Sequence, residues 1–173
     1  MDCQTQPVSK GTSRFPDAQA LQKMMAARLA PSFAPHEALA EALLPHVLGS
    51  SDDGSHDVSH LQRVFKVAMT LCAAENGEAE IVAAAVLLHD CVQVEKNSPL
   101  RAEVSHLSAE RAGEILAALG WEHARIDAAT HAILTHSFSA NVAPETLEAK
   151  IVQDADRLDA IGFVGIARCF YTA

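Results

Sequence analysis

The longest apolar run of the chain, residues 81–88, ends directly in the dipeptide His89–Asp90. An uninterrupted apolar run of this kind is typical of a segment that is buried on every side. A buried charge is costly unless it has an opposite charge or a metal ion as partner. We therefore expect the fold to bring further polar groups to His89 and Asp90.

The sequence pattern favours helices along the whole chain. It shows no sustained period-two alternation of β-branched residues, and the helix-favouring residues Ala, Leu and Glu dominate. We therefore expect an all-α protein, with helices over residues 18–30, 36–48, 58–76, 79–92, 109–119, 122–137 and 145 to about 170, the last with a break at Gly162. Ser108 can cap the fifth helix, and Gly77 and Gly120 can take the left-handed conformation after a helix end.

Length and composition fit one domain. A chain of 173 residues that is 49% hydrophobic can bury a sizeable core. We expect the domain to span residues 18–173, after a mobile polar tail over residues 1–17. This tail has no apolar signal-peptide core, and no apolar run reaches the ~20 residues that cross a bilayer, so we expect a cytoplasmic protein without membrane contact. The cysteines lack CxxC spacing and fit free thiols in a reducing compartment: Cys3, Cys72, Cys91 and Cys169.

The charge balance disfavours a long nucleic acid as partner. Against 13 Lys and Arg stand 22 Asp and Glu, for a net charge of −9. Binding to a nucleic acid backbone depends on neutralising its phosphates with basic residues. A nucleotide remains compatible, because a metal ion and one or two cations can neutralise its few phosphates.

A second inward-facing histidine precedes the His89–Asp90 pair. His60 shares a helix face with Val64 and Val67, which places it on the buried side of its helix. His56, which forms an earlier His–Asp pair with Asp57, remains an alternative to His60.

Three carboxylates follow near the end of the chain. Asp154, Asp156 and Asp159 lie at the edges of a buried helix face, and spacing alone does not decide among them. Two imidazoles with two carboxylates and no thiolate suit a divalent ion such as Mn²⁺, Ni²⁺, Fe²⁺ or Mg²⁺. The sequence therefore predicts a metal site.

Four sequence blocks resemble the HD-domain superfamily of metal-dependent phosphohydrolases, in its subgroup of small bacterial predicted hydrolases. The blocks are SHDVSHLQRVFKVA, AAAVLLHDCVQVEK, ILTHSFS and KIVQDADRLDAIGFVGIAR. They occur in the family's order and cover roughly residues 55–168. The resemblance implies a single HD-domain bundle of about six to eight helices. The family's chain usually continues past the last block, which leaves open whether this domain lacks a closing C-terminal segment.

The resemblance also implies roles for single residues. It places the metal ligands at His60, His89, Asp90 and Asp156, with a second metal ion as an option. Asp90 and Arg63 are the expected catalytic residues, because Arg63 can direct its planar guanidinium at a phosphate. Further candidates for substrate or a second metal are Arg63, Lys66, His106, His136 and Asp159, and Asp159 could instead support a metal ligand from one helical turn away. Asp154 is expected to orient a ligand histidine. Apart from the resemblance, residues 93–107 form a long polar connection directly after the His89–Asp90 pair, and such connections often act as lids.

The expected reaction is hydrolysis of a small phosphorylated molecule, most simply a nucleotide. Two other classes stay open. The superfamily scaffold supports oxygenase chemistry when it holds two irons, and a non-catalytic domain could bind a nucleotide or metal as a sensor. Homo-oligomer formation also stays open.

Overall fold

The structure, a computed structural model, describes residues 17–48, 58–95 and 98–172. The α-helices are α1 (Ala18–Leu29), α2 (Glu37–Leu43), α3 (Val58–Glu75), α4 (Ala79–Leu88), α5 (Val104–Ala118), α6 (His123–His136), α7 (Leu147–Asp159) and α8 (Gly162–Thr172). Short 3-10 turns are η1 (Ala30–Phe33), η2 (Leu44–His46), η3 (Pro99–Glu103) and η4 (Phe138–Ala140). The described residues contain no strand, which confirms the predicted all-α class.

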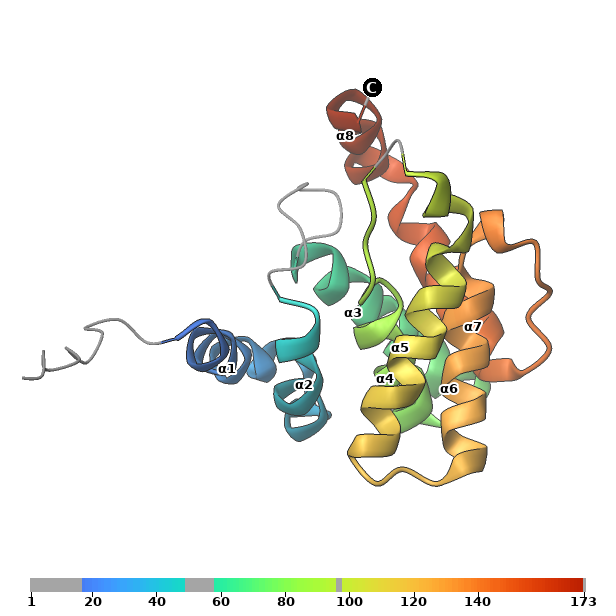
Figure 1. The fold of residues 1–173 in the computed structure, drawn as a ribbon. Helices are drawn as coiled ribbons and strands as arrows, with labels where there is room; N and C mark the ends of the chain where they lie inside the picture. The colour runs from blue at the N-terminus through green and yellow to red at the C-terminus, as the bar shows by residue number, and fades with distance from the viewer. Residues whose placement is uncertain (1–16, 49–57, 96–97, 173) are drawn as a thin grey trace, which may run out of the picture.

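Helix α4 forms the centre of the bundle. All of its residues from Ile81 to Leu88 are buried, as their unbroken apolar character predicts. Helices α3, α6, α7 and α2 pack against it, and α5 packs on α6 (Figure 1). The C-terminal end of α4 is therefore enclosed by neighbouring helices, and polar groups there must find partners inside the protein.

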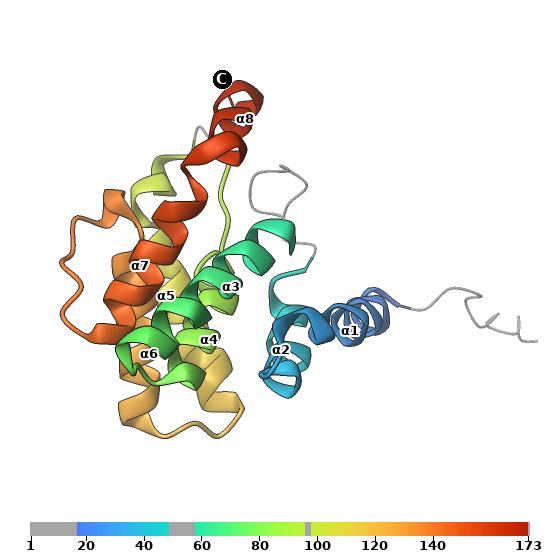
Figure 2. The same cartoon turned by 180° about the vertical axis from the view of Figure 1, so that it is seen from behind.

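Helices α1 and α2 pack beside this bundle, and they are joined to it by contacts of α2 with α4 and of η1 with α3 (Figure 2). Asp17 caps α1 by accepting a hydrogen bond of 2.7 Å from the Ala20 amide. The predicted helix over residues 36–48 is divided, because Pro45 lacks the amide hydrogen that an α-helix needs and α2 gives way to η2. Residues 1–16 of the expected tail lie outside the described residues.

Two local predictions are wrong. Helix α5 begins at Val104 and not after Ser108, so most of the expected connection over residues 93–107 is η3 and the first turn of α5. Ser108 is fully buried and contacts the backbone of Val92 instead, with its Oγ 3.3 Å from the Val92 amide nitrogen. After α3 the left-handed residue is Asn76 and not Gly77, whereas Gly120 has the expected positive φ of 79°.

The predicted break at Gly162 is confirmed. Gly162 has a φ of 76°, which separates α7 from α8. A Cβ at Gly165 would collide with the Ala160 carbonyl oxygen, so this turn also needs a glycine there. Helix α8 extends beyond the end of α7 (Figure 1). Its apolar side chains Phe163 and Phe170 are exposed. Within the described residues, no helix is both long and apolar enough to span a membrane.

Candidate metal centre

The end of α4 places His89 and Asp90 in the interior. His89 is the C-cap residue of α4 and is 1% exposed, and its Nδ1 lies 2.7 Å from the carbonyl oxygen of Val86 in the last turn. The side chain of Asp90 is 15% exposed, so it closes one side of the site toward solvent. His89 and Asp90 directly follow the buried residues of α4. Burial of this helix therefore also brings the two polar groups into the interior.

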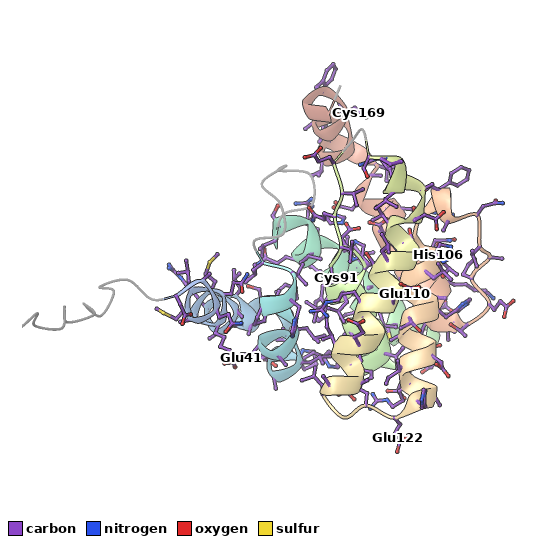
Figure 3. The ribbon with its side chains drawn as sticks, in the orientation of Figure 1. Glu41, Cys91, His106, Glu110, Glu122 and Cys169 are labelled. Carbon is purple, nitrogen blue, oxygen red and sulfur yellow. The ribbon has the colours of Figure 1, made fainter. Side chains whose placement is uncertain are left out.

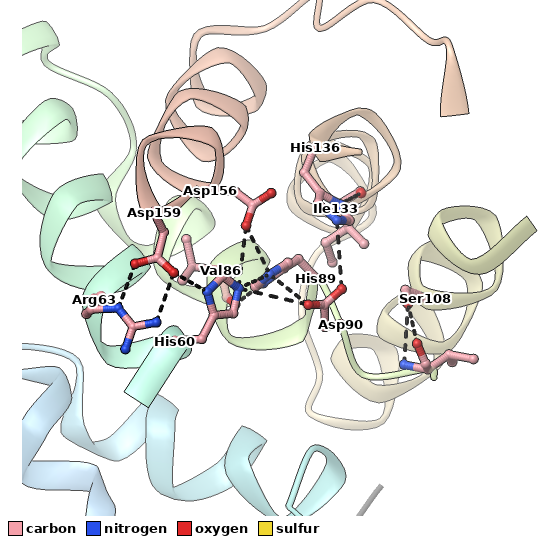
Figure 4. Close-up of polar contacts among 11 residues, drawn as sticks. His60, Arg63, Val86, His89, Asp90, Ser108, Ile133, His136, Asp156 and Asp159 are labelled. Carbon is pink, nitrogen blue, oxygen red and sulfur yellow. Dashed lines mark hydrogen bonds and ion pairs between the residues drawn. The ribbon is translucent and has the colours of Figure 1, made fainter. Parts of the chain in front are cut away.

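Helices α3 and α7 add the remaining groups from positions far apart in sequence. The two helices pack side by side, which brings His60 from α3 against Asp156 from α7. The His60 Nε2 atom lies 3.3 Å from the His89 Nε2 atom and 3.4 Å from the Asp156 Oδ1 atom. The Asp90 Oδ2 atom is 3.3 Å from the His89 Nε2 atom (Figure 4). We call His60, His89, Asp90 and Asp156 the donor cluster.

The spacing within the donor cluster fits a divalent ion. One donor atom from each of His60, His89 and Asp90 lies within 4.8 Å of the others, and Asp156 Oδ1 lies 3.4 Å and 3.8 Å from the two imidazole Nε2 atoms. An ion about 2.1 Å from each donor keeps neighbouring donors about 3.0 Å apart in an octahedron and about 3.4 Å apart in a tetrahedron. Three residues are therefore close enough to hold an ion, and Asp156 stands at a compatible distance.

The ring orientations also fit an ion. His89 Nδ1 donates to the Val86 carbonyl and His60 Nδ1 to a carboxylate oxygen of Asp159, 2.8 Å away. Each ring then directs its Nε2 lone pair into the donor cluster. Two lone pairs at 3.3 Å repel each other unless a proton or a cation lies between them.

The electrostatics of the donor cluster also favour a positive charge at its centre. Burial disfavours the charged form of His89, but Asp90 and Asp156 outweigh it and raise the pKa of His89 to about 9. Burial and the neighbouring His89 lower the pKa of both His60 and His136. Without an ion, this cluster holds one proton on His89, in the position that a cation would take.

A fifth group approaches from α6. His136 is buried, and its Nδ1 lies 2.5 Å from the Ile133 carbonyl oxygen, so this ring also directs Nε2 inward. Its Nε2 is 3.9 Å from Asp90 Oδ1, whereas Asp90 Oδ2 faces His89. Asp90 therefore faces His89 with one oxygen and His136 with the other (Figure 4), and the rings of His89 and His136 also lie side by side with their centroids 4.9 Å apart.

Arg63 and Asp159 form a pair beside the donor cluster. Arg63 Nε lies 2.6 Å and Arg63 Nη2 lies 3.0 Å from the two carboxylate oxygens of Asp159. Burial raises the pKa of Asp159, but the hydrogen bonds from Arg63 and His60 outweigh it and bring this pKa to about 2. The guanidinium expected to contact a phosphate is thus bound to a carboxylate.

Three expected site residues lie apart from the cluster. Asp154 is exposed, and the carboxylate that hydrogen-bonds to His60 is that of Asp159. The α-helical period explains the difference, because Asp156 and Asp159 are three residues apart and share a face, while Asp154 points away. Lys66 is exposed and borders a groove of about 520 Å³ against η1. His106 is exposed on α5 (Figure 3), and the alternative ligand His56 lies outside the described residues.

Sequence reasoning did not find the pairing of Arg63 and Asp159 with His60. A signal for it exists in hindsight: His60 and Arg63 are three residues apart on α3, so one carboxylate from a neighbouring helix can reach both. Another histidine of α6, His131, accepts a hydrogen bond of 3.0 Å from the Glu145 amide through its Nε2.

The fold and the donor cluster together define a helical bundle whose interior presents imidazole and carboxylate groups in an arrangement that fits a divalent ion. Residues 57–161 match the family model described as HD domain. The chain belongs to the HD-domain family, as the four sequence blocks predict. The alignment to YpgQ, an uncharacterized protein of Bacillus subtilis (strain 168), is 36% identical over 128 residues. It covers 72% of this chain and 60% of the length of YpgQ.

The comparison with solved structures leads to the same family. A crystal structure described as a predicted HD superfamily hydrolase, from an uncultured Thermotogales bacterium, matches with a TM-score of 0.56 and 30% identity, covering 85% of this chain and 73% of that one. A protein of Lactobacillus plantarum matches at 0.58 and 28% identity, covering 91% and 63%. YpgQ in complex with ADP matches at 0.55 and 30% identity, covering 90% and 67%.

Proposed function

We propose that this protein is a metal-dependent phosphohydrolase that acts on a small phosphorylated molecule, with a nucleotide as the favoured substrate. The observation that supports this most directly is the convergence of two imidazole Nε2 atoms with the carboxylates of Asp90 and Asp156 at the buried end of α4. The ADP bound to the related YpgQ supports the nucleotide as substrate class.

The ligands in this proposal are His60, His89, Asp90 and Asp156. The ion is Mn²⁺, Ni²⁺, Fe²⁺ or Mg²⁺, because a site of nitrogen and oxygen donors without a thiolate favours these ions. When bound, a divalent ion supplies a water of lowered pKa and a Lewis acid for the phosphoryl oxygen. The protein contributes fixed positions, because all four residues lie on or directly after packed helices.

Access to the site is from the side of Asp156. Its side chain is 26% exposed, against 2% for His60 and 1% for His89. A phosphate that approaches there meets Asp156 before the imidazoles, so its own charge must be offset by the ion. Asp90 can face the ion with Oδ2 and accept a proton from the attacking water with Oδ1, on the side of His136.

The charge that develops on the phosphoryl group needs a donor beyond the ion. Neutral His136 keeps its hydrogen on Nδ1, facing the Ile133 carbonyl, and presents a lone pair at Nε2, so in this proposal it suits a second ion and not a donor to this charge. Lys66 and His106 remain predictions for contacts with outlying phosphates, because both are exposed and can move toward a substrate.

A screen of nucleoside mono-, di- and triphosphates tests the proposal, with each of the four ions added separately and phosphate distinguished from pyrophosphate among the products. We expect turnover with at least one ion, and its loss in His89→Gln and Asp90→Asn. The matched controls are His123→Gln and Asp154→Asn, which change exposed residues of the same types. Metal binding without turnover of any of these nucleotides would favour the sensor alternative.

The position of His136 favours one further candidate. Because Asp90 faces the donor cluster with one oxygen and His136 with the other, the pair could hold a second ion. The oxygenase alternative depends on this second position being occupied by iron. A ratio of two metal ions per chain that falls to one in His136→Ala would support two ions, and oxygen uptake by the iron-loaded protein would separate oxygenation from hydrolysis.

A further inference from the structure

A chain of hydrogen bonds runs from α3 through α7 to the donor cluster. Arg63 binds both carboxylate oxygens of Asp159, at 2.6 Å and 3.0 Å, and Asp159 Oδ2 lies 2.8 Å from His60 Nδ1. The Arg63 Nη1 atom lies 2.9 Å from Ser59 Oγ, one helical turn earlier on α3. Asp159 and Ser59 thereby fix the guanidinium in one plane, and Figure 4 shows its contacts with Asp159.

This arrangement determines which nitrogen of His60 carries the proton. An ionised carboxylate can only accept hydrogen bonds, so the short contact to Asp159 requires a hydrogen on His60 Nδ1. In the neutral ring, Nε2 then has a lone pair directed at His89 and Asp156. Only this tautomer can serve as a ligand from Nε2.

We propose that Arg63 and Asp159 are positioning residues that hold His60 in the tautomer and ring orientation needed to bind the ion through Nε2. Arg63 acts through Asp159 and not on the phosphate of the substrate. This inference rests on the proposed metal binding, but the tautomer of His60 is a property of the metal-free protein and can be measured by itself.

The substitution Asp159→Asn separates this role from a structural one. An amide has one acceptor oxygen and one donor nitrogen, so it cannot accept from Arg63 and His60 with both ends. Arginine is always charged and only donates, so the amide oxygen turns to Arg63 and the amide N–H faces His60 Nδ1. The His60 proton must then move to Nε2, into the donor cluster, where it blocks an ion.

Removal of Arg63 from this variant should reverse the effect. In Arg63→Ala/Asp159→Asn, the amide oxygen no longer has a guanidinium to face and can turn to His60. The proton of His60 then returns to Nδ1. A residue that matters only for folding would give the opposite result, because a second substitution would add to the damage of the first.

The experiment uses two readouts on the full chain. Long-range proton–nitrogen spectra of the metal-free, ¹⁵N-histidine-labelled protein identify the tautomer of His60. The signals of His60 are assigned as those that disappear in His60→Gln. Calorimetric titration with Mn²⁺ gives the affinity. The variants are Asp159→Asn, Arg63→Ala and the double variant. The control is Arg125→Ala, since Arg125 is similarly exposed and also pairs at 2.6 Å, with Glu80 near the start of α4.

We expect Asp159→Asn to move the proton to Nε2 and to weaken Mn²⁺ binding by about 10- to 100-fold, the usual effect of losing a partner of a metal ligand. Arg63→Ala should keep the tautomer and weaken binding by about tenfold, because Asp159 loses its fixed position. The double variant should recover the Nδ1 tautomer and bind Mn²⁺ more tightly than Asp159→Asn. Arg125→Ala should bind like the wild type.

An unchanged tautomer in Asp159→Asn would overturn the inference, as would wild-type Mn²⁺ affinity in Arg63→Ala. Normal affinity with slow turnover in Arg63→Ala would assign Arg63 to the phosphate after all. If the wild type binds no Mn²⁺, Ni²⁺, Fe²⁺ or Mg²⁺, the proposed function fails, while the spectra still decide whether Asp159 sets the tautomer of His60.

Discussion

The affinity of this protein for Mn²⁺ should depend steeply on pH, because His89 must lose a proton before it can bind an ion. In the metal-free protein Asp90 and Asp156 outweigh burial and raise the pKa of His89 to about 9. At about pH 7 the charged ring then outnumbers the neutral ring by about 100-fold, and at about pH 8 by about tenfold. Mn²⁺ should therefore bind about tenfold more tightly at about pH 8 than at about pH 7, a difference of about 1.4 kcal/mol.

Calorimetric titration with Mn²⁺ in buffers of different ionisation enthalpy measures both the affinity and the number of protons released. With the raised pKa, about one proton per ion should leave at about pH 7. A histidine with an ordinary pKa would release only about 0.2 proton there, and its affinity would rise only about 1.3-fold up to about pH 8. Because burial lowers the pKa of His60 and His136, neither ring contributes in this range.

The same protonation links metal-free stability to pH. The pKa of His89 is higher in the folded protein than in the unfolded chain, where it is about 6.5, so protonation of His89 stabilises the fold. This stabilisation is complete below about pH 6.5 and is lost as the pH rises through about 9. Its size is on the order of 3 kcal/mol. Urea unfolding of the metal-free protein should show falling stability across this window, with recovery when Mn²⁺ is added. Flat affinity, release of much less than one proton, or stability that does not fall with pH would refute the reasoning.

Three further predictions follow from single contacts. Asp156→Ala should weaken Mn²⁺ binding by at least about tenfold, whereas Asp154→Ala, at an exposed position, should not change the titration. Leu88→Ala should lower the free energy of unfolding by about 2–5 kcal/mol because Leu88 is fully buried, and the half-exposed Leu119→Ala should cost less than about 1 kcal/mol, both measured in urea. Thr146→Ala removes the hydroxyl that accepts a hydrogen bond from the Ala149 amide at the start of α7, and it should lower the free energy of unfolding by about 0.5–2 kcal/mol. An unchanged urea midpoint would show that this cap contributes nothing to stability.

The sequence alone determined the fold class and the centre of the bundle. Residues 81–88 are apolar without interruption, so they could only be a buried segment, and α4 is buried along this whole run. The helix break at Gly162 was equally local, since a positive φ acts within one or two residues. The division at Pro45 was not predicted, although the missing amide hydrogen that causes it is also a local feature. The burial of His89 followed from its place at the end of that run.

Only the tertiary structure decided how the polar groups near His89 are paired. The sequence could not rank Asp154 against Asp159, because they lie at different edges of the buried face of α7 and the choice depends on how α7 is rotated against α3. In the structure this rotation places Asp159 between Arg63 and His60, and leaves Asp154 in solvent. Local patterns fix which residues are helical and buried, but hydrogen bonds between residues nearly a hundred positions apart depend on the packing of whole helices.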